Sequence, residues 1–166
     1  PMDFLEGLRD SIKTADPDAL IIGEVWEDAS NKESYGTIRN YCYGKTLDSV
    51  MNYPLRTAVL DFMCGEITSE DACSALMSQM ENYPPEFLNA AMNLLGSHDR
   101  ARLRTALSGA PDPDTLTRKK QAVYTNAKEI SDESAAMVKC ATAIMFTLPG
   151  VPYVYYGDET GMTGMA

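Results

Sequence analysis

Residues that bind metals or nucleic acids are scarce in this sequence. It contains a single histidine, His98, and its four cysteines, Cys42, Cys64, Cys73 and Cys140, lack the CxxC or Cys/His spacing of a zinc site. Its 24 acidic residues outnumber 14 basic ones, and nothing concentrates lysine and arginine into a phosphate-binding face. We therefore expect no metal site, free and mostly buried thiols, and a neutral substrate rather than nucleic acid.

Three further patterns are missing. No apolar run reaches the roughly 20 residues that a membrane-spanning helix needs, so we expect no membrane partner. The first residues do not form the basic segment and apolar segment of an export signal. No strand-like run is followed by GxGxxG or GxxxxGK[ST], which leaves an α/β phosphate- or nucleotide-binding protein without support. Because Pro1 opens the chain within a helical pattern, we expect a segment of a longer protein.

The sequence does contain enough apolar residues for a core. Hydrophobic residues make up 45% of the 166 positions, which predicts one folded domain, residues 1–166, without a second. Apolar residues with a helical period over 2–14 predict an amphipathic helix. Helix-start signals at Thr68 and Ser131 begin two further helices, and we expect the second of these to be well buried.

Short apolar runs alternate with the predicted helices. They fall at residues 20–25, 47–52, 91–95 and 151–156, and no β-hairpin dipeptide separates them. This repeated order of strand and helix predicts an α/β fold with a parallel sheet whose strands are covered on both faces. Ligands and chemistry gather at the carboxyl ends of such strands, so polar residues there are candidates for a site.

Glu24 and Asp99 lie at the ends of two of these runs. Glu24 is a candidate general acid or base, and an ion-paired or loop-capping glutamate explains its position equally well. Asp99 is either a site residue or the N-cap of the next helix, and His98 is either its partner or a buried histidine. Trp26 opens an aromatic loop over 26–43, whose rings suit stacking on sugars or bases and equally suit hydrophobic lids.

Taken together, these stretches resemble glycoside hydrolase family 13, the α-amylase family. IGEVW at 22–26 is similar to the motif of barrel strand five, LLGSHD at 94–99 to that of strand seven, and PGVPYVYYGDE at 149–159 to the strand-eight segment. VMNYP at 50–54 resembles strand six of the cyclomaltodextrinase, neopullulanase and maltogenic amylase group. The order and spacing of the motifs agree with that group over essentially the whole chain.

The resemblance implies that residues 1–166 form half of a (β/α)8 TIM barrel, namely strands five to eight with their helices. In the family the nucleophilic aspartate ends strand four, and a calcium site is associated with the domain inserted after strand three. Both are therefore expected outside this chain, and no other cofactor is implied. Half a barrel exposes two strand edges and its apolar interior, so we expect this chain to form a homo-oligomer.

The resemblance also assigns roles to the residues at the strand ends. Glu24 takes the position of the catalytic proton donor, and Asp99 that of the catalytic residue that stabilises the transition state. His98 and Trp26 take substrate-binding positions, the first as a donor to a sugar hydroxyl and the second as apolar stacking surface. A retaining glycosidase needs two carboxyl groups about 5–5.5 Å apart, one of them the nucleophile, so we expect this chain alone to be inactive.

For the intact protein, the resemblance implies hydrolysis of α-1,4-glucosidic bonds in maltooligosaccharides, cyclodextrins or other α-glucans by a retaining double displacement. It leaves α-1,6 cleavage and transglycosylation open. The alternative is a non-catalytic half barrel that binds α-glucan or has a structural role. Free cysteines, together with the intracellular location typical of the cyclomaltodextrinase group, favour a cytoplasmic location.

Overall fold

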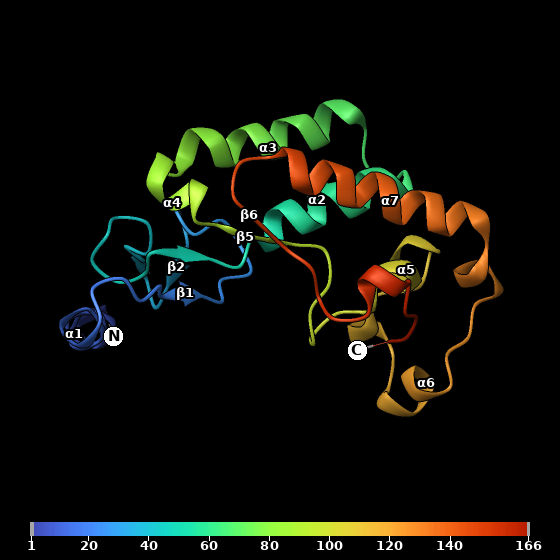
Figure 1. Ribbon diagram of the computed structural model, residues 1–166, viewed down its shortest axis with the longest axis horizontal. Helices are drawn as coiled ribbons and strands as arrows, with labels where there is room; N and C mark the ends of the chain where they lie inside the picture. The colour runs from blue at the N-terminus through green and yellow to red at the C-terminus, as the bar shows by residue number, and fades with distance from the viewer. Residues whose placement is uncertain (1, 166) are drawn as a thin grey trace.

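A computed structural model describes residues 2–165 as a mixed structure of helices and strands (Figure 1). The α-helices are α1 (Met2–Ala15), α2 (Tyr53–Cys64), α3 (Ser69–Asn82), α4 (Pro85–Asn89), α5 (Leu103–Leu107), α6 (Arg118–Ala122) and α7 (Asp132–Thr147). The strands are β1 (Ile22–Gly23), β2 (Glu33–Ser34), β3 (Thr37–Ile38), β4 (Ser49–Val50), β5 (Met92–Leu94) and β6 (Val151–Tyr153). Short 3₁₀ helices are η1 (Pro113–Thr115), η2 (Ala127–Ile130) and η3 (Asp158–Thr160). Helix α2 packs against both α3 and α7 (Figure 1).

Strands β1, β4, β5 and β6 lie side by side in chain order and run parallel to one another. Strand β1 pairs with β4, with Ile22 opposite Ser49, and β5 pairs with β6, with Met92 opposite Val151. A parallel bridge between Met51 and Met92 joins the two pairs. Each successive strand is reached through a connection long enough for a parallel crossover, as in α/β proteins. This order confirms the parallel α/β arrangement that the sequence predicted.

The loop after β1 contains an antiparallel hairpin, which no hairpin dipeptide in the sequence indicates. Strands β2 and β3 pair across a turn formed by Tyr35 and Gly36, with Ser34 opposite Thr37. Both turn residues have positive φ, 55° for Tyr35 and 72° for Gly36. Two-residue hairpin turns of this kind favour Asn-Gly or Asp-Gly, because both positions need positive φ. A tyrosine at the first position gives no such signal.

The inner strands β4 and β5 are the most deeply buried part of the sheet. Val50 is 1% exposed and Leu94 0%. Across these strands, the side-chain amide of Asn52 donates to Asn93 Oδ1 at 2.9 Å, and Asn93 Nδ2 donates to the Pro149 carbonyl at 2.9 Å. Buried amides are stable only when such bonds are made. The asparagine pair therefore fixes β4, β5 and the segment before β6 relative to one another.

Local sequence signals set the starts of the helices that follow the strands. The Asn52 side chain accepts a hydrogen bond from the Leu55 backbone N–H at 3.2 Å and so caps α2, whose first turn contains Pro54. Thr68 caps α3 by accepting from the Asp71 backbone N–H at 3.1 Å, and the Asp71 carboxylate accepts in return from the Thr68 backbone N–H. This is the reciprocal capping box that the sequence predicted at Thr68.

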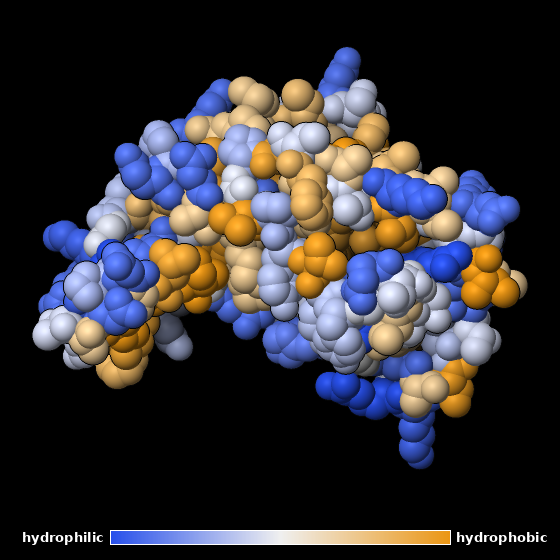
Figure 2. Space-filling model, viewed as in Figure 1, coloured by the Kyte–Doolittle hydropathy of each residue, from blue (hydrophilic) through white to orange (hydrophobic). Residues whose placement is uncertain are grey.

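Several expectations of burial were wrong. The four cysteines are free as expected, but only Cys42 is buried. Helix α7 was expected to be well buried, yet Phe146 on it is 56% exposed, and the outer strand positions Leu20 and Val151 are 70% and 54% exposed. Hydrophobic residues, coloured orange in Figure 2, accordingly lie at several places on the surface. The outer elements have a packing neighbour on one side only, which periodicity alone does not reveal.

No helix among residues 2–165 is long and apolar enough to cross a membrane.

Candidate active site

The carboxyl ends of β1, β4 and β5 bring a group of polar side chains together. Glu24 directly follows β1, and Tyr53 follows β4 as the first residue of α2. Ser97 and Asp99 lie in the turn after β5. Because neighbouring parallel strands end at the same edge of a sheet, these three segments meet there.

Tyr53 connects the two segments that carry the predicted catalytic residues. Its hydroxyl lies 3.2 Å from Glu24 Oε1 and 3.2 Å from Ser97 Oγ. Ser97 Oγ in turn accepts a hydrogen bond from the Asp99 backbone N–H at 3.3 Å. A continuous hydrogen-bonded path therefore runs from the Glu24 carboxyl through Tyr53 and Ser97 to the backbone of Asp99.

The surroundings of Tyr53 keep its phenol neutral. Burial raises the pKa of Tyr53; the hydrogen bond with Ser97 opposes this, and the nearby charges of Glu24 and Asp99 raise the pKa further. Tyr53 is 2% exposed. A neutral phenol with a raised pKa retains its proton at physiological pH and is available as a hydrogen-bond donor.

Trp26 forms the aromatic side of this group. Its ring stacks on that of Tyr53, with centroids 4.3 Å apart and planes 6° from parallel. The Arg100 guanidinium carbon lies 4.3 Å from the centroid of the Trp26 ring, within the range of a cation–π contact. Arg100 is held in place by ion pairs with Asp112 and Asp114, at 3.2 and 3.8 Å. Trp26 is therefore a fixed wall that is still 37% exposed.

A pocket of about 510 Å³ opens beside this wall. It is lined by Trp26, His98 and Asp99 together with residues of the η1–α6 segment: Pro113, Asp114, Leu116, Arg118 and Gln121. His98 Nε2 lies 3.3 Å from Asp99 Oδ2, and both side chains are open to solvent. Three of the four predicted site residues thus line one cavity, and Glu24 is linked to them through Tyr53.

The structure decides between several of the alternatives that the sequence left open. Helix α5 begins at Leu103 with Arg102 at its cap position, so Asp99 is not the N-cap of that helix. His98 is exposed, which excludes the buried, satisfied histidine. Within residues 2–165, Glu24 forms no ion pair, and its carboxylate receives the hydrogen bond of Tyr53.

Tyr53 and Ser97 are the two residues of the site that sequence reasoning missed. The sequence offered a signal for each, because Tyr53 follows a predicted strand end and Ser97 stands between the apolar run and Asp99. Neither a tyrosine nor a serine is distinctive at such a position. Their contacts reach 29 and 44 residues along the chain, so only the folded arrangement identifies them.

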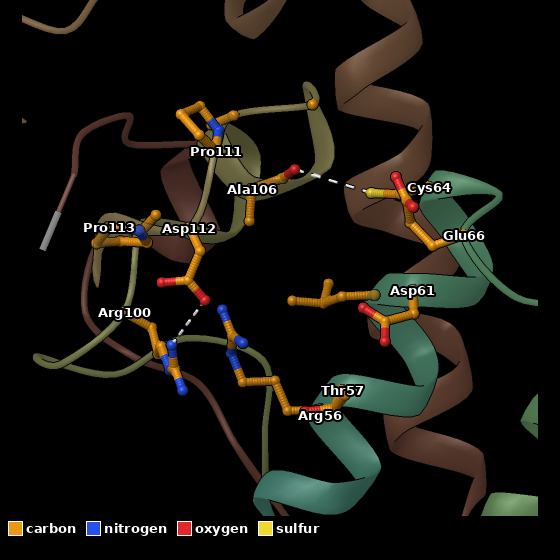
Figure 3. A pocket seen from close by; sticks show the side chains of 14 residues that line it. Arg56, Thr57, Asp61, Cys64, Glu66, Arg100, Ala106, Pro111, Asp112 and Pro113 are labelled. Carbon is orange, nitrogen blue, oxygen red and sulfur yellow. Dashed lines mark hydrogen bonds and ion pairs between the residues drawn. The ribbon is translucent and has the colours of Figure 1, made fainter. Parts of the chain in front are cut away.

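A second and larger cavity, of about 760 Å³, is lined by Arg56, Arg100 and Asp112 among other residues (Figure 3). Figure 3 shows the guanidinium groups of Arg56 and Arg100 beside Asp112. Arg56 Nε donates to the Leu95 carbonyl at 3.0 Å, and burial lowers the pKa of Arg56 to about 10, with a further contribution from the Arg100 charge. Arg56 remains a cation at neutral pH, so this cavity holds charges of both signs.

Among residues 2–165, no group of three or more His, Cys, Asp or Glu side chains is arranged to hold a metal ion.

The chain resembles known proteins over its whole length. A sequence model of the alpha-amylase catalytic domain matches residues 1–166. A cyclomaltodextrinase from Thermoanaerobacter pseudethanolicus is 34% identical over 162 residues, which are 97% of this chain and 22% of that protein. Neopullulanase 2 from Thermoactinomyces vulgaris is 33% identical, with the same coverage of 97% and 22%. The chain therefore spans 22% of the length of these relatives.

Solved structures resemble the fold described here. The cyclic alpha-maltosyl-(1→6)-maltose hydrolase from Arthrobacter globiformis superposes with a TM-score of 0.75 at 28% identity, over 99% of this chain and 30% of that one. The type III pullulan hydrolase from Thermococcus kodakarensis gives a TM-score of 0.76 at 29% identity, over 98% and 24%. With a family model that matches every residue and relatives that are named glycoside hydrolases, this chain belongs to the α-amylase catalytic-domain family.

Proposed function

We propose that this chain is the half of a (β/α)8 barrel that contains strands five to eight, in an enzyme that hydrolyses α-1,4-glucosidic bonds of α-glucans. The sequential parallel order of β1, β4, β5 and β6 supports the first part. The second part is supported by relatives named cyclomaltodextrinase, neopullulanase and amylopullulanase. Maltooligosaccharides and cyclodextrins are the substrates that we expect first.

The observation that carries the proposal is the link between the two strand ends. Glu24 and the Asp99 turn are joined through Tyr53 and Ser97, and Trp26, His98 and Asp99 line one pocket. A sugar in that pocket would meet an aromatic wall, a donor and a carboxylate, which are the groups that glycoside recognition and cleavage use.

In the proposed reaction, Glu24 protonates the glycosidic oxygen as the leaving group departs. The Asp99 carboxylate accepts hydrogen bonds from sugar hydroxyls, and these bonds strengthen as positive charge develops on the ring. His98 donates to a neighbouring hydroxyl, and the exposed part of Trp26 stacks on the sugar. A retaining displacement also needs a carboxylate nucleophile, which we propose lies outside residues 1–166. We therefore propose that these 166 residues alone give no turnover.

The test compares the complete protein that contains this chain with the 166-residue chain on cyclodextrin, maltotriose and pullulan. We expect hydrolysis by the complete protein only, and Glu24→Gln in it to lower kcat by at least about 1,000-fold, because the proton donor is lost. Asn31→Gln, at an exposed amide in the same loop, is the matched control and should retain activity. Full hydrolysis by Glu24→Gln would refute the assignment of Glu24 as the acid. If the unsubstituted complete protein bound glucan without hydrolysing it, the result would favour a non-catalytic glucan-binding domain.

We further propose that the isolated chain forms a homo-oligomer through its outer strands. Val151, Tyr153 and Val154 at β6 are 54%, 38% and 45% exposed, which is unusual for a strand segment of this apolarity. Burying such an edge against a second copy would remove apolar surface from water. A dilution series in sedimentation velocity should give a concentration-dependent species larger than 18.2 kDa. A compact monomer at all concentrations would refute this proposal.

A further inference from the structure

We infer that Tyr53 is the positioning residue of the active site, whose hydroxyl holds the Glu24 carboxyl in the orientation needed for proton transfer. This inference rests on the proposed function, because it assigns Glu24 the role of the proton donor. The juxtaposition that carries it is a buried phenol in hydrogen-bond contact with both the Glu24 carboxylate and the Ser97 hydroxyl.

The Tyr53 side chain is itself firmly held. It is 2% exposed, and its ring stacks against that of Trp26 at 4.3 Å. Its backbone begins α2, where the Asn52 cap and the ring of Pro54 restrict the chain. A side chain with so little freedom presents its hydroxyl at a defined point. Tyr53 thus provides a rigid reference for a carboxylate that is exposed in its own loop.

The direction of the hydrogen bonds follows from the proton count. A neutral phenol has one proton to donate, and Glu24 Oε1 is the carboxyl oxygen that accepts it. The Ser97 hydroxyl then donates to the Tyr53 oxygen, and Ser97 Oγ accepts from the Asp99 N–H. Donation from Ser97 polarises the phenol and strengthens its bond to Glu24. The position of Glu24 is in this way tied to the turn that carries Asp99.

Tyr53 acts through Glu24 and does not contact the substrate. Its side chain is covered, at 2% exposure, whereas Glu24 is exposed and can meet a sugar. Among the described residues, the hydroxyl of Tyr53 is the side-chain group that hydrogen-bonds the Glu24 carboxylate. Removing this hydroxyl leaves Trp26, His98 and Asp99 in place, so it should change the chemical step more than substrate binding.

The experiment is Tyr53→Phe in the complete protein, with kcat and KM measured separately on maltotriose. We expect kcat to fall about 10- to 100-fold, the range for losing a hydrogen bond to a charged group, and KM to change less than about threefold.

Tyr83→Phe is the matched control. Tyr83 is also buried, at 3% exposure, and its hydroxyl accepts from the Ala29 backbone N–H at 2.9 Å, away from the carboxylates of the site. This variant should lower the melting temperature while kcat and KM remain those of the unsubstituted protein. An unchanged kcat in Tyr53→Phe, or a loss of kcat/KM that comes wholly from a raised KM, would overturn the inference.

Two further variants keep the result interpretable. If Tyr53→Phe fails to fold, Ser97→Ala replaces it, and should lower kcat about three- to tenfold while KM changes less than about threefold. An unchanged kcat in Ser97→Ala then overturns the inference. Glu24→Gln separates this inference from the proposed function. If Glu24→Gln is inactive and Tyr53→Phe fully active, only the positioning role fails. If Glu24→Gln is active, the assignment of the proton donor fails.

Discussion

The inner strands β4 and β5 and the outer strands β1 and β6 belong to one parallel sheet but differ sharply in environment. At the inner strands, Ser49, Val50 and Leu94 are at most 1% exposed. At the outer strands, Val151 is 54% and Tyr153 38% exposed. An inner strand has a hydrogen-bonded neighbour on each side and packed layers over it, whereas an outer strand has one neighbour.

The difference in burial between inner and outer strands explains which residues of the site are rigidly held. Tyr53 and Ser97 follow the inner strands β4 and β5, and both are buried. Glu24 follows the outer strand β1 and is exposed. The buried inner strands therefore hold Tyr53 and Ser97 in place. The hydrogen bond from Tyr53 then holds the Glu24 carboxylate, which follows an outer strand.

The largest expected effect contrasts one residue from each kind of strand. Leu94→Ala should lower the free energy of unfolding by about 2–5 kcal/mol, because it removes buried methyl groups and leaves a cavity. Val151→Ala, on the outer strand, should change it by less than about 0.5 kcal/mol. Urea unfolding of both variants measures this directly. Equal losses would mean that β6 is as tightly packed as β5.

The asparagine pair tests whether polar contacts add to the rigidity of the inner strands. Asn93→Ala should cost about 1–3 kcal/mol, because the Asn52 amide and the Pro149 carbonyl lose their partner while remaining buried. A double-mutant cycle with Asn52→Ala should give a coupling energy above about 0.5 kcal/mol. Additive losses would show that the two amides do not support each other.

Near the outer strand β1, the Asp48 carboxylate binds side chains of α1 and the backbone directly before β1. Burial raises the pKa of Asp48, but hydrogen bonds from Arg9, Lys13 and the Ile21 N–H outweigh this, so its pKa is lowered overall. A lowered carboxyl pKa contributes stability that is present above the ordinary value near 4 and lost as pH falls through the folded-state value. Asp48→Asn should therefore cost about 1 kcal/mol at pH 7. The difference in stability between the variant and the unsubstituted chain should shrink as a urea series is taken below about pH 4.

Asp61 provides the opposite case as a control for Asp48. Burial and the nearby Glu66 charge raise the pKa of Asp61, so its charged form is disfavoured in the folded chain. A raised carboxyl pKa means stability is lost as pH rises above the ordinary value. Asp61→Asn should leave stability at pH 7 unchanged or slightly increased. A loss as large as that of Asp48→Asn would contradict both assignments.

The last contrast concerns the hairpin beyond β1. Gly36→Ala should destabilise the chain by about 1 kcal/mol, because φ is 72° at this position and alanine tolerates positive φ poorly. Gly7→Ala is the matched variant, in α1 with open space around the site, and should stabilise by about 0.5–1 kcal/mol. Thermal melts followed by circular dichroism distinguish the two signs. If alanine changed the stability in the same direction at both positions, the positive φ at Gly36 would not disfavour a side chain.

Local chemistry made much of the fold predictable. The Thr68 capping box, the start of α2 around Pro54 and the apolar runs of the four parallel strands depend on residues within a few positions of one another. The Tyr35-Gly36 hairpin was missed because Tyr35 is not a residue that favours positive φ. The burial of three cysteines was predicted wrongly because a thiol's exposure depends on which elements pack over it, which the local sequence does not specify.

By itself, the sequence determined the order of the four parallel strands, the carboxylates at the strand ends and the family resemblance, because each depends on residue types at short spacing. Only the tertiary structure decided that Trp26 stacks on Tyr53, that Asp99 caps no helix and that Tyr53 and Ser97 join Glu24 to the Asp99 turn. The physical reason is that these contacts form when parallel strands align their carboxyl ends, which brings together side chains far apart in the sequence.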